Sequence, residues 1–275
     1  MNTKKPWSVN ISNASLVRNQ PVTKGFTLVE LIGAVAIGMI MLLAIYAAIN
    51  SAQRSSSGIG GKVTAQQDAR TALEQMAMDI RMASYNSTLN NSIWVKPTNP
   101  PSNSLVATSN PTYKGIQEAT PTSLTIEMYI SPNTEPLIGG YQNEIIRYAY
   151  DTSNLQITRE ANPAGYCITG GSGAQSFLGA AVGSNPRDVL VTNNTVIQNG
   201  NGVYGAVFRY FQANGQEIYP TLALNGTGNG SPIPNIRRIL ITLAVQTQFI
   251  DPTTKQPRNL VYSTSVIPMN HGINP

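Results

Sequence analysis

The sequence predicts an α+β protein in which a long N-terminal helix packs on an antiparallel β-sheet domain. Three patterns carry this prediction. Residues 24–49 form an almost unbroken apolar run, and residues 63–85 repeat apolar residues at spacings of three and four. From residue 123 onward, short runs that alternate apolar and polar residues are separated by turn-forming segments. Helical periodicity followed by strand periodicity, in separate parts of a chain, is typical of the α+β class.

The apolar run predicts a membrane-spanning helix with one unexpected charge. After Glu30 it is long enough to cross a bilayer, because about 20 helical residues span the ~30 Å hydrocarbon core. Glu30 lies about one helical turn in from Phe26, where a membrane anchor alone does not need an acid. An unpaired charge in an apolar environment is costly. We therefore expect a chain that assembles, so that a later partner neutralises Glu30.

The charge of the chain is concentrated at its start. Eighteen basic and thirteen acidic residues give a net charge of +5, and residues 1–25 supply +4 of it through Lys4, Lys5, Arg18 and Lys24, with no acid. Positive residues before a first membrane span keep that end in the cytoplasm. We therefore interpret the basic excess as a topogenic signal, so the high net charge is not evidence for nucleic-acid binding. Only 11% of residues are charged, a composition common in exported proteins.

Residues 51–62 are rich in Ser and Gly, and they predict a weakened or melted stretch between two helical halves. A helical pattern returns over residues 63–86, and its apolar stripe is expected to pack on a sheet. The stripe comprises Ala69, Leu73, Met76, Ile80 and Ala83. The charged residues of this segment, Asp79 among them, are expected to lie mostly off the stripe, and the helix is expected to end near Tyr85.

The rest of the chain predicts strands and loops. Residues 87–121 are rich in Asn, Pro, Ser and Thr, and residues 151–154 form a plausible hairpin turn. Loops are expected at 162–185, 193–202 and 225–230. The predicted strands are 123–130, 144–150, 155–159, 189–192, 205–212, 236–249 and 260–267.

Catalytic and metal-binding motifs are missing from the sequence, so we expect no enzyme, no cofactor and no metal ion. His271 is the only histidine and lies in a Pro/Gly/Asn tail, which argues against a Ser-His-Asp triad or a zinc site. The chain has no phosphate-binding loop, no paired cysteines and no D-x-D-x-D calcium loop. A calcium site built from loop carbonyls stays open.

Other conspicuous residues have structural interpretations. Cys167 is the only cysteine, so no intramolecular disulfide can form, and we expect a small buried side chain, with an intermolecular link or a reactive thiol as alternatives. Arg237 and Arg238 are expected at a sheet edge or in an ion pair rather than in a DNA-binding patch. The tyrosines and phenylalanines of the β region are expected to be core or cross-strand partners: Tyr141, Tyr148, Tyr150, Tyr204, Phe208, Tyr210 and Phe211.

The segment Gly-Phe-Thr-Leu-Val-Glu at residues 25–30, after a basic leader and before an apolar span, closely resembles the processing signal of type IV pilins and type II secretion pseudopilins. The resemblance implies that a prepilin peptidase cuts after Gly25 on the cytoplasmic face and methylates the new amine of Phe26. It implies that Lys24 helps to hold the scissile bond in the cytoplasm. It further implies that Glu30 pairs with the Phe26 amine of an adjacent subunit.

A second resemblance narrows the class. Residues 69–85, and strand-like pieces at 146–160, 207–216 and 236–247, resemble PilW-type minor pilins and GspJ-type minor pseudopilins. The leader is longer than is typical of type IVa pilins, and a single cysteine gives no disulfide loop of the major-pilin kind. The resemblance therefore implies a minor subunit with a pilin-like fold.

These expectations divide the chain into five parts. They are a cleaved leader at 1–25, a transmembrane helical half at 26–50, a Gly/Ser-rich break at 51–62, an amphipathic helical half at 63–86, and an extracytoplasmic β-rich domain at 87–275. The expected location is the inner membrane, crossed once, and then the tip of a pilus or pseudopilus. The expected partners are the prepilin peptidase and N-methyltransferase, other minor and major pilins or pseudopilins, and inner-membrane lipid, with no nucleic acid required.

Three interpretations of function stay open on the sequence. The first is a PilW-like minor pilin that initiates or caps pilus assembly, and its near alternative is a GspJ-like pseudopilin of a type II secretion system. The second is a tip adhesin that binds a surface or DNA through the loops at 162–185 and 193–202. The third, an exported enzyme on a pilin-like anchor, has no catalytic motif to support it.

Overall fold

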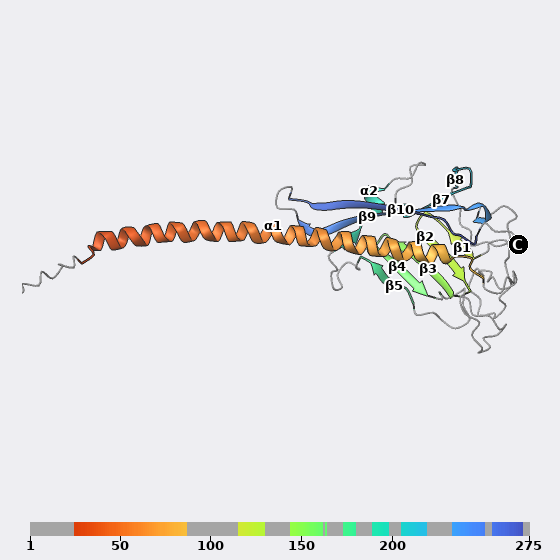
Figure 1. Ribbon diagram of the computed structural model, residues 1–275, viewed down its shortest axis with the longest axis horizontal. Helices are drawn as coiled ribbons and strands as arrows, with labels where there is room; N and C mark the ends of the chain where they lie inside the picture. Colours follow the sequence, from red (N-terminus) through yellow and green to blue (C-terminus); the bar gives the residue numbers. More distant parts are fainter. Residues whose placement is uncertain are drawn as a thin grey trace, which may run out of the picture. The chain divides into compact units, whose positions relative to one another are not determined.

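A computed structural model of the chain describes residues 25–86, 115–129, 144–161, 163, 173–179, 189–197, 205–218, 233–250 and 255–271. A 55-residue helix, α1 (Leu28–Met82), precedes all of the strands (Figure 1). The chain forms two compact units, Met1–Ala52 and Gln53–Pro275, and α1 contributes residues to both. The predicted order of a long N-terminal helix followed by antiparallel strands is confirmed.

The helix is continuous through residues 51–62, so the predicted break is not present in this structure. A glycine costs a helix interior about 0.5–1 kcal/mol. Adding a residue to an existing helix is far easier than nucleating one, so helical turns on both sides carry the segment through. The Ser57 hydroxyl adds a local contact by donating to the Gln53 carbonyl at 2.8 Å.

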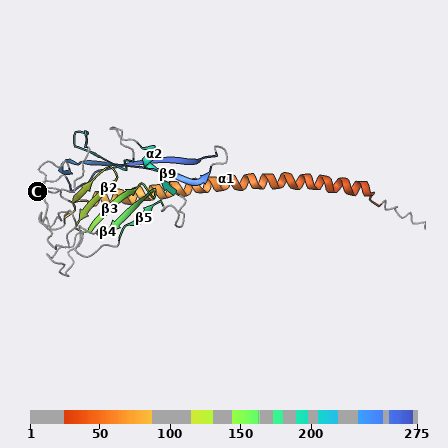
Figure 2. The same cartoon turned by 180° about the vertical axis from the view of Figure 1, so that it is seen from behind.

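The β strands form two antiparallel sheets rather than one. The first has the order β1-β2-β3-β4-β5, and the second has the order β10-β9-β7-β8 with β6 also paired to β9. Both sheets are visible from opposite sides in Figures 1 and 2. The bounds are β1 (Ile116–Ala119), β2 (Ser123–Met128), β3 (Glu144–Asp151), β4 (Gln156–Ala161), β5 (Gln175–Leu178), β6 (Val189–Val191), β7 (Phe208–Phe211), β8 (Glu217–Ile218), β9 (Arg238–Ile250) and β10 (Pro257–Val266).

Two predicted loops contain regular structure. Strand β5 lies within the expected loop at 162–185, and a short helix α2 (Asn193–Val196) lies within the expected loop at 193–202. A 3-10 turn, η2 (Ile233–Asn235), precedes β9. The predicted turn after β3 is confirmed, because the Asp151 carboxylate accepts hydrogen bonds from the backbone of Ser153 and Asn154 at 2.9 and 3.1 Å. The loop predicted at 225–230 lies outside the described residues.

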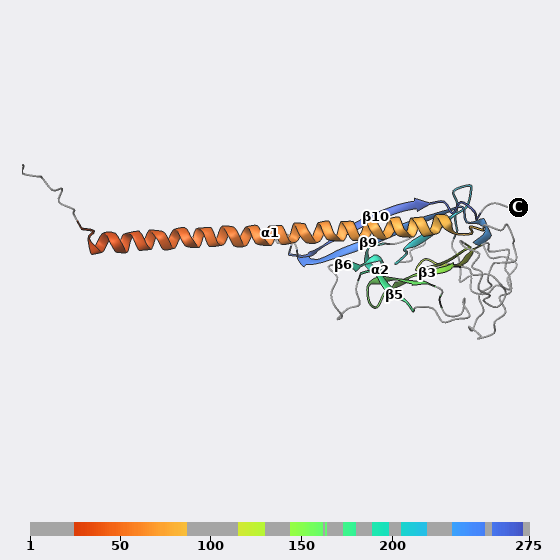
Figure 3. The same cartoon turned by 60° about the horizontal axis from the view of Figure 1, so that its bottom comes forward.

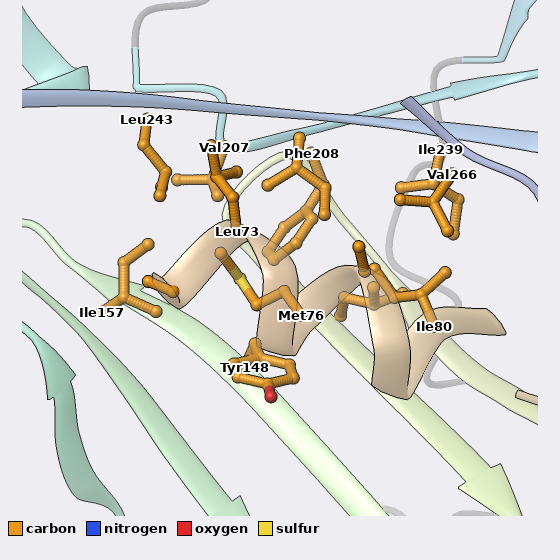
Figure 4. Close-up of a cluster of buried hydrophobic side chains, with 14 of the residues drawn as sticks. Leu73, Met76, Ile80, Tyr148, Ile157, Val207, Phe208, Ile239, Leu243 and Val266 are labelled. Carbon is orange, nitrogen blue, oxygen red and sulfur yellow. The ribbon is translucent and has the colours of Figure 1, made fainter. Parts of the chain in front are cut away.

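The core joins the C-terminal half of α1 to both sheets. Figure 4 shows Leu73, Met76 and Ile80 of α1 between side chains of the first sheet and side chains of the second. The sheet residues labelled there are Tyr148 and Ile157 on one side, and Val207, Phe208, Ile239, Leu243 and Val266 on the other. The predicted apolar stripe therefore faces a core, as expected, but it serves two sheets at once.

Hydrogen bonds from backbone and side-chain donors tie the two sheets together. The Pro121 carbonyl, in the turn between β1 and β2, accepts from the backbone of Val207 and Phe208 at 2.8 and 3.0 Å. The Tyr150 hydroxyl of β3 donates to the Val191 carbonyl of β6 at 2.9 Å. Five of the aromatic residues expected in the core are buried there: Tyr148, Tyr150, Phe208, Tyr210 and Phe211. Tyr141 and Tyr204 lie outside the described residues.

Helix α1 ends at Met82, somewhat earlier than expected, because the chain turns there and joins the first sheet. Ser84 adopts a left-handed backbone conformation (φ 62°), and its N–H donates to the Glu127 carbonyl at 3.0 Å. Gly115 also lies against this turn with φ 83°, and a Cβ at Gly115 would stand 2.6 Å from the Glu127 carbonyl oxygen. Only glycine fits such a close approach without displacing backbone.

Candidate processing and assembly site

The helix begins with a reciprocal capping arrangement between Thr27 and Glu30. The Thr27 backbone N–H and its hydroxyl both donate to Glu30 Oε2, at 2.9 and 3.0 Å. In return, the Glu30 N–H donates to Thr27 Oγ1 at 3.3 Å. Thr27 immediately precedes Leu28, the first helical residue. This is the capping box, in which an N-cap Thr and a Glu three residues later satisfy two otherwise unpaired helix donors.

The capping box gives Glu30 a local role that the sequence interpretation did not include. A Thr-x-x-Glu pattern immediately before an apolar run was visible at residues 27–30 and is a recognised helix-start signal. The interaction holds the carboxylate in the first turn, close along the chain to Phe26. Glu30 remains fully exposed to its surroundings, so its side chain is accessible to a second chain.

The residues on the N-terminal side of the cap are exposed. Phe26 is 90% exposed, and the position that a side chain would occupy at Gly25 is open space. An exposed segment outside any helix or strand is accessible to a peptidase. Lys24, the other predicted residue of this site, lies outside the described residues.

The apolar first half of α1 is exposed throughout, and α1 is the one helix in the described ranges that is long and apolar enough to cross a membrane. The large exposed residues include Leu31, Val35, Ile40, Leu43 and Tyr46. In water such a surface is unstable, because every buried Leu or Ile side chain contributes about 1.5–3 kcal/mol. The segment therefore requires lipid or other apolar helices around it.

A polar contact holds the second half of α1 to the first sheet. Asp79 Oδ2 accepts from the Tyr148 hydroxyl at 2.6 Å and from an Arg159 guanidinium nitrogen at 3.3 Å. Burial, together with the neighbouring Asp79 carboxylate, raises the pKa of Tyr148 far above its usual value. Asp79 is buried, so the prediction that it lies off the apolar stripe is wrong. Its spacing of three from Met76 and four from Ala83 could have shown that it shares the buried face.

His271 lies in an irregular segment after β10, as expected, but its side chain is buried. Its Nε2 lies 2.8 Å from the Ile233 carbonyl oxygen, which can only accept, so Nε2 carries the proton. Nδ1 lies 3.0 Å from the Ser84 hydroxyl. In a catalytic triad a carboxylate would contact the histidine, whereas His271 contacts the Ile233 carbonyl, and the Ser84 and His271 side chains are both buried. The geometry therefore fits an anchor for the C-terminal segment rather than a nucleophile.

The remaining candidate residues take structural roles. Arg237 donates to the carbonyls of Pro234 and Ile236, and the Arg238 guanidinium lies 4.0 Å from the centre of the Phe211 ring. Arg238 begins β9, which lies between β10 and β7, so the sheet-edge part of the prediction is wrong for Arg238. In the described ranges no group of three or more His, Cys, Asp or Glu side chains could hold a metal ion. Cys167 lies outside them.

Comparison with known proteins supports the family that the sequence resembles. Residues 22–46 match the prokaryotic N-terminal methylation motif, which covers the predicted cleavage position, the capping box and most of the apolar run. The motif implies an N-terminally processed subunit of a filament system. With the long helix and the antiparallel strands, it supports a type IV pilin or pseudopilin.

Two other comparisons do not strengthen the family assignment. No curated protein matches the chain. Among solved structures, a type IV-like pilin from Thermus thermophilus is similar with 10% sequence identity and a TM-score of 0.37, over 76% of this chain and 98% of that one. The apolar helix and the motif together indicate membrane anchoring.

Proposed function

We propose that this protein is a minor type IV pilin of the PilW type, which a prepilin peptidase cleaves between Gly25 and Phe26 and which helps to initiate or cap a pilus at its tip. The observation that carries the proposal is the exposed Glu30 carboxylate, held in the first turn of an exposed apolar helix within the methylation motif. Pilins are structural proteins, and the proposed mechanism is assembly rather than catalysis.

Cleavage would convert the leader into a discarded signal and create a new charge. Lys24 and the other leader cations would keep the scissile bond in the cytoplasm. Gly25 presents a backbone without a side chain to the peptidase. The product begins at Phe26, with a methylated amine that is still cationic. Four of the five excess positive charges leave with residues 1–25, so the mature chain is close to neutral.

Assembly would use the two charges at the start of the mature chain. Both the Phe26 amine and the Glu30 carboxylate would lie within apolar surroundings once helices pack against one another, where unpaired charges are strongly disfavoured. Pairing the amine of one subunit with Glu30 of its neighbour removes both penalties and fixes the stagger between subunits. The capping box supports this pairing because it restricts the carboxylate to one region of the helix surface.

The assignment to a minor subunit rests on the PilW-type and GspJ-type resemblance of residues 69–85 and of three strand pieces. Within residues 69–85, the Asp-Ile-Arg run at residues 79–81 includes the buried Asp79, whose partners lie on β3 and β4. A GspJ-like pseudopilin would use the same anchor and sheets, and neighbouring genes for pilus assembly or for secretion would separate the two. A tip adhesin acting through residues 162–185 and 193–202 stays a prediction, since most of those residues lie outside the described ranges.

The decisive experiment separates the capping role of Glu30 from its charge. Glutamine can replace glutamate in a capping box, so Glu30→Gln keeps the cap and removes the charge. Glu30→Ala removes both, and Thr27→Ala keeps the charge but removes the capping hydroxyl. Each variant is expressed in cells that make filaments, and the processed chain is quantified in the membrane fraction and in sheared filaments.

Charge pairing predicts that Glu30→Gln and Glu30→Ala are both processed but excluded from filaments, while Thr27→Ala still enters. If Glu30→Gln entered filaments as well as the unmodified chain, capping would be sufficient and the charge-pairing account would be wrong.

A further inference from the structure

Strand β10 forms one margin of the second sheet. It pairs along its length with β9, and β9 lies between β10 and the strands β6 and β7. Figure 3 shows the same order, with β10 at the outside and β9 between it and β6. In the described part of the chain, no strand pairs with the outer side of β10. An unpaired edge exposes backbone donors and acceptors that can bind another strand.

The hydrogen bonds of β9 show which backbone groups of β10 point outward. The Thr242 N–H donates to the Val207 carbonyl at 2.9 Å, on the side of β9 away from β10. The Ala244 N–H and carbonyl also bond on that side, with Asn193 and Thr192. In an antiparallel ladder, such residues face partners that direct their own backbone groups outward. Those partners are Ser263 and Val261, and Ser265 follows by alternation.

Only the first residues of β10 carry features that usually prevent an edge strand from pairing with another strand. Natural edge strands are protected by proline, charged side chains or bulges. In β10 all three features, a proline, a charged side chain and a bulge, occur within Pro257–Asn259, where the register with β9 shifts. Residues 260–266 contain no proline and no charge. The side chains of Ser263 and Ser265, exposed beside the outward backbone groups, are small enough to let another strand approach.

The surfaces on either side of the edge define the chemistry of an incoming strand. On the outer face, Val261, Ile267 and Met269 are 52%, 59% and 67% exposed, which favours an apolar neighbour. On the inner face, the Arg70 guanidinium of α1 lies 6.0 Å from the centre of the Tyr262 ring. No described carboxylate forms an ion pair with Arg70. An acidic side chain opposite Tyr262 would therefore meet an available cation.

We propose that the outer edge of β10 is a docking edge for an extended segment of another subunit of the same filament. The segment pairs antiparallel to β10, bonds to the backbone of Val261, Ser263 and Ser265, and carries a carboxylate beside Arg70. The partner's identity as a filament subunit rests on the proposed function. The edge rests on the second sheet alone, and its charge preference rests on Arg70 of α1 beside Tyr262.

The test uses the purified full-length chain in detergent and a defined peptide. The peptide copies residues 259–267 with Thr264→Glu. When it pairs antiparallel with Ser263 opposite Ser263, its acidic residue lies opposite Tyr262 and beside Arg70. Hydrogen exchange is measured at the amides of Val261, Ser263 and Ser265. Saturating peptide is expected to slow exchange at these three amides at least about tenfold, since they change from solvent to ladder hydrogen bonds.

Matched variants of the peptide and of the chain make the result specific. A matched peptide with Thr264→Lys is expected to bind several-fold more weakly, and Arg70→Glu in the chain is expected to reverse that preference. Ser263→Pro removes one outward N–H without removing a bond to β9, so it is expected to abolish binding, while Ser263→Thr keeps it. Absence of protection at the three amides, a charge preference that ignores Arg70, or normal binding to Ser263→Pro would each overturn the proposal.

The cellular counterpart separates this proposal from the proposed function. Ser263→Pro is expected to be cleaved and methylated normally but to be depleted from sheared filaments relative to Ser263→Thr. Equal entry of both variants would refute the docking edge while leaving the pilin function intact. A chain that is never cleaved would instead refute the proposed function, and the peptide-binding result would stand on its own.

Discussion

Replacing Asp79 with alanine tests whether the polar contact between α1 and the first sheet stabilises the fold. Asp79 accepts from Tyr148, Arg159 and Gln75, at 2.6, 3.3 and 3.0 Å. The substitution leaves a buried tyrosine hydroxyl without this acceptor and a partly buried guanidinium without its counter-ion. Each loss has a separate energetic consequence.

The expected destabilisation is about 2–4 kcal/mol. Breaking a fully buried ion pair costs about 3–5 kcal/mol. The Arg159 side chain is 32% exposed, so water replaces part of the lost interaction. The orphaned Tyr148 hydroxyl adds about 1–3 kcal/mol, because the neighbouring Arg159 Nε, 3.1 Å from its oxygen, can only donate and does not replace the lost acceptor. These effects overlap, because the same carboxylate serves both partners, so the total is below their sum.

The assay is denaturant unfolding of the full-length chain in detergent, followed by the near-ultraviolet circular dichroism of its tyrosines. Glu74→Ala is the matched control, since Glu74 is an exposed acid on the same helix. It is expected to change the unfolding free energy by less than about 0.5 kcal/mol. If Asp79→Ala were no more destabilising than Glu74→Ala, the contact would not hold the helix to the sheet, and the reasoning would be refuted.

Three further predictions concern the backbone and one turn. Gly115→Ala is expected to destabilise the fold by about 1–3 kcal/mol more than Gly215→Ala in the same unfolding assay. Both glycines have positive φ, but only at Gly115 would the added Cβ lie within 3 Å of backbone atoms. Equal effects of the two substitutions would contradict the close approach at Gly115. Gly60→Ala, where the added Cβ meets open space, is expected to strengthen the helix by about 0.5–1 kcal/mol and to slow hydrogen exchange over residues 53–62. If local melting of this segment accompanies entry into the filament, the same variant lowers filament yield, and an unchanged yield would count against melting. A hydrogen bond from the Asn154 side chain lowers the pKa of Asp151, so its stabilisation is present above its unfolded pKa of about 3.9 and is lost as the pH falls through the lower folded value. Asp151→Asn is expected to remove this part of the pH dependence below about pH 4, and an unaltered profile would show that the turn does not contribute.

The elements that were predictable from sequence are those with a strong local pattern. The strands β2 and β9 alternate apolar and polar residues, β3 and β10 are runs rich in β-branched and aromatic residues, and the apolar run at the N-terminus strongly favours a helix. The turn at Asp151 has an equally local cause, because its side chain bonds to the backbone two and three residues later. Such features depend on interactions between close neighbours in the chain, which the sequence displays directly.

The features that were missed depend on partners far away in the chain. Asp79 finds its partners 69 and 80 residues later, and His271 bonds to a serine 187 residues earlier. No periodicity reveals such a contact, so a buried acid on a helix resembles an exposed one. The division into two sheets was missed for the same reason, since β6 and β7 both pair with β9 across long connections.

The continuous helix at residues 51–62 shows a different limit. The sequence correctly marks the segment as intrinsically weak, but weakness alone does not decide whether a helix breaks. At the candidate site the functional residue was predicted from sequence, but its local contacts were not. Glu30 was recognised from the motif around it, while its hydrogen bonds with Thr27 required coordinates, although the capping pattern was visible in the letters.

The central claim is that this chain is a pilin-type precursor whose working form begins at Phe26. The most direct test is the intact mass and N-terminal sequence of the chain recovered from the membranes of cells that carry a prepilin peptidase. The account predicts a product that lacks residues 1–25 and starts with a methylated Phe26, and a full-length product in cells without the peptidase. A chain that keeps its leader when the peptidase is present, or is cut at another bond, would contradict it.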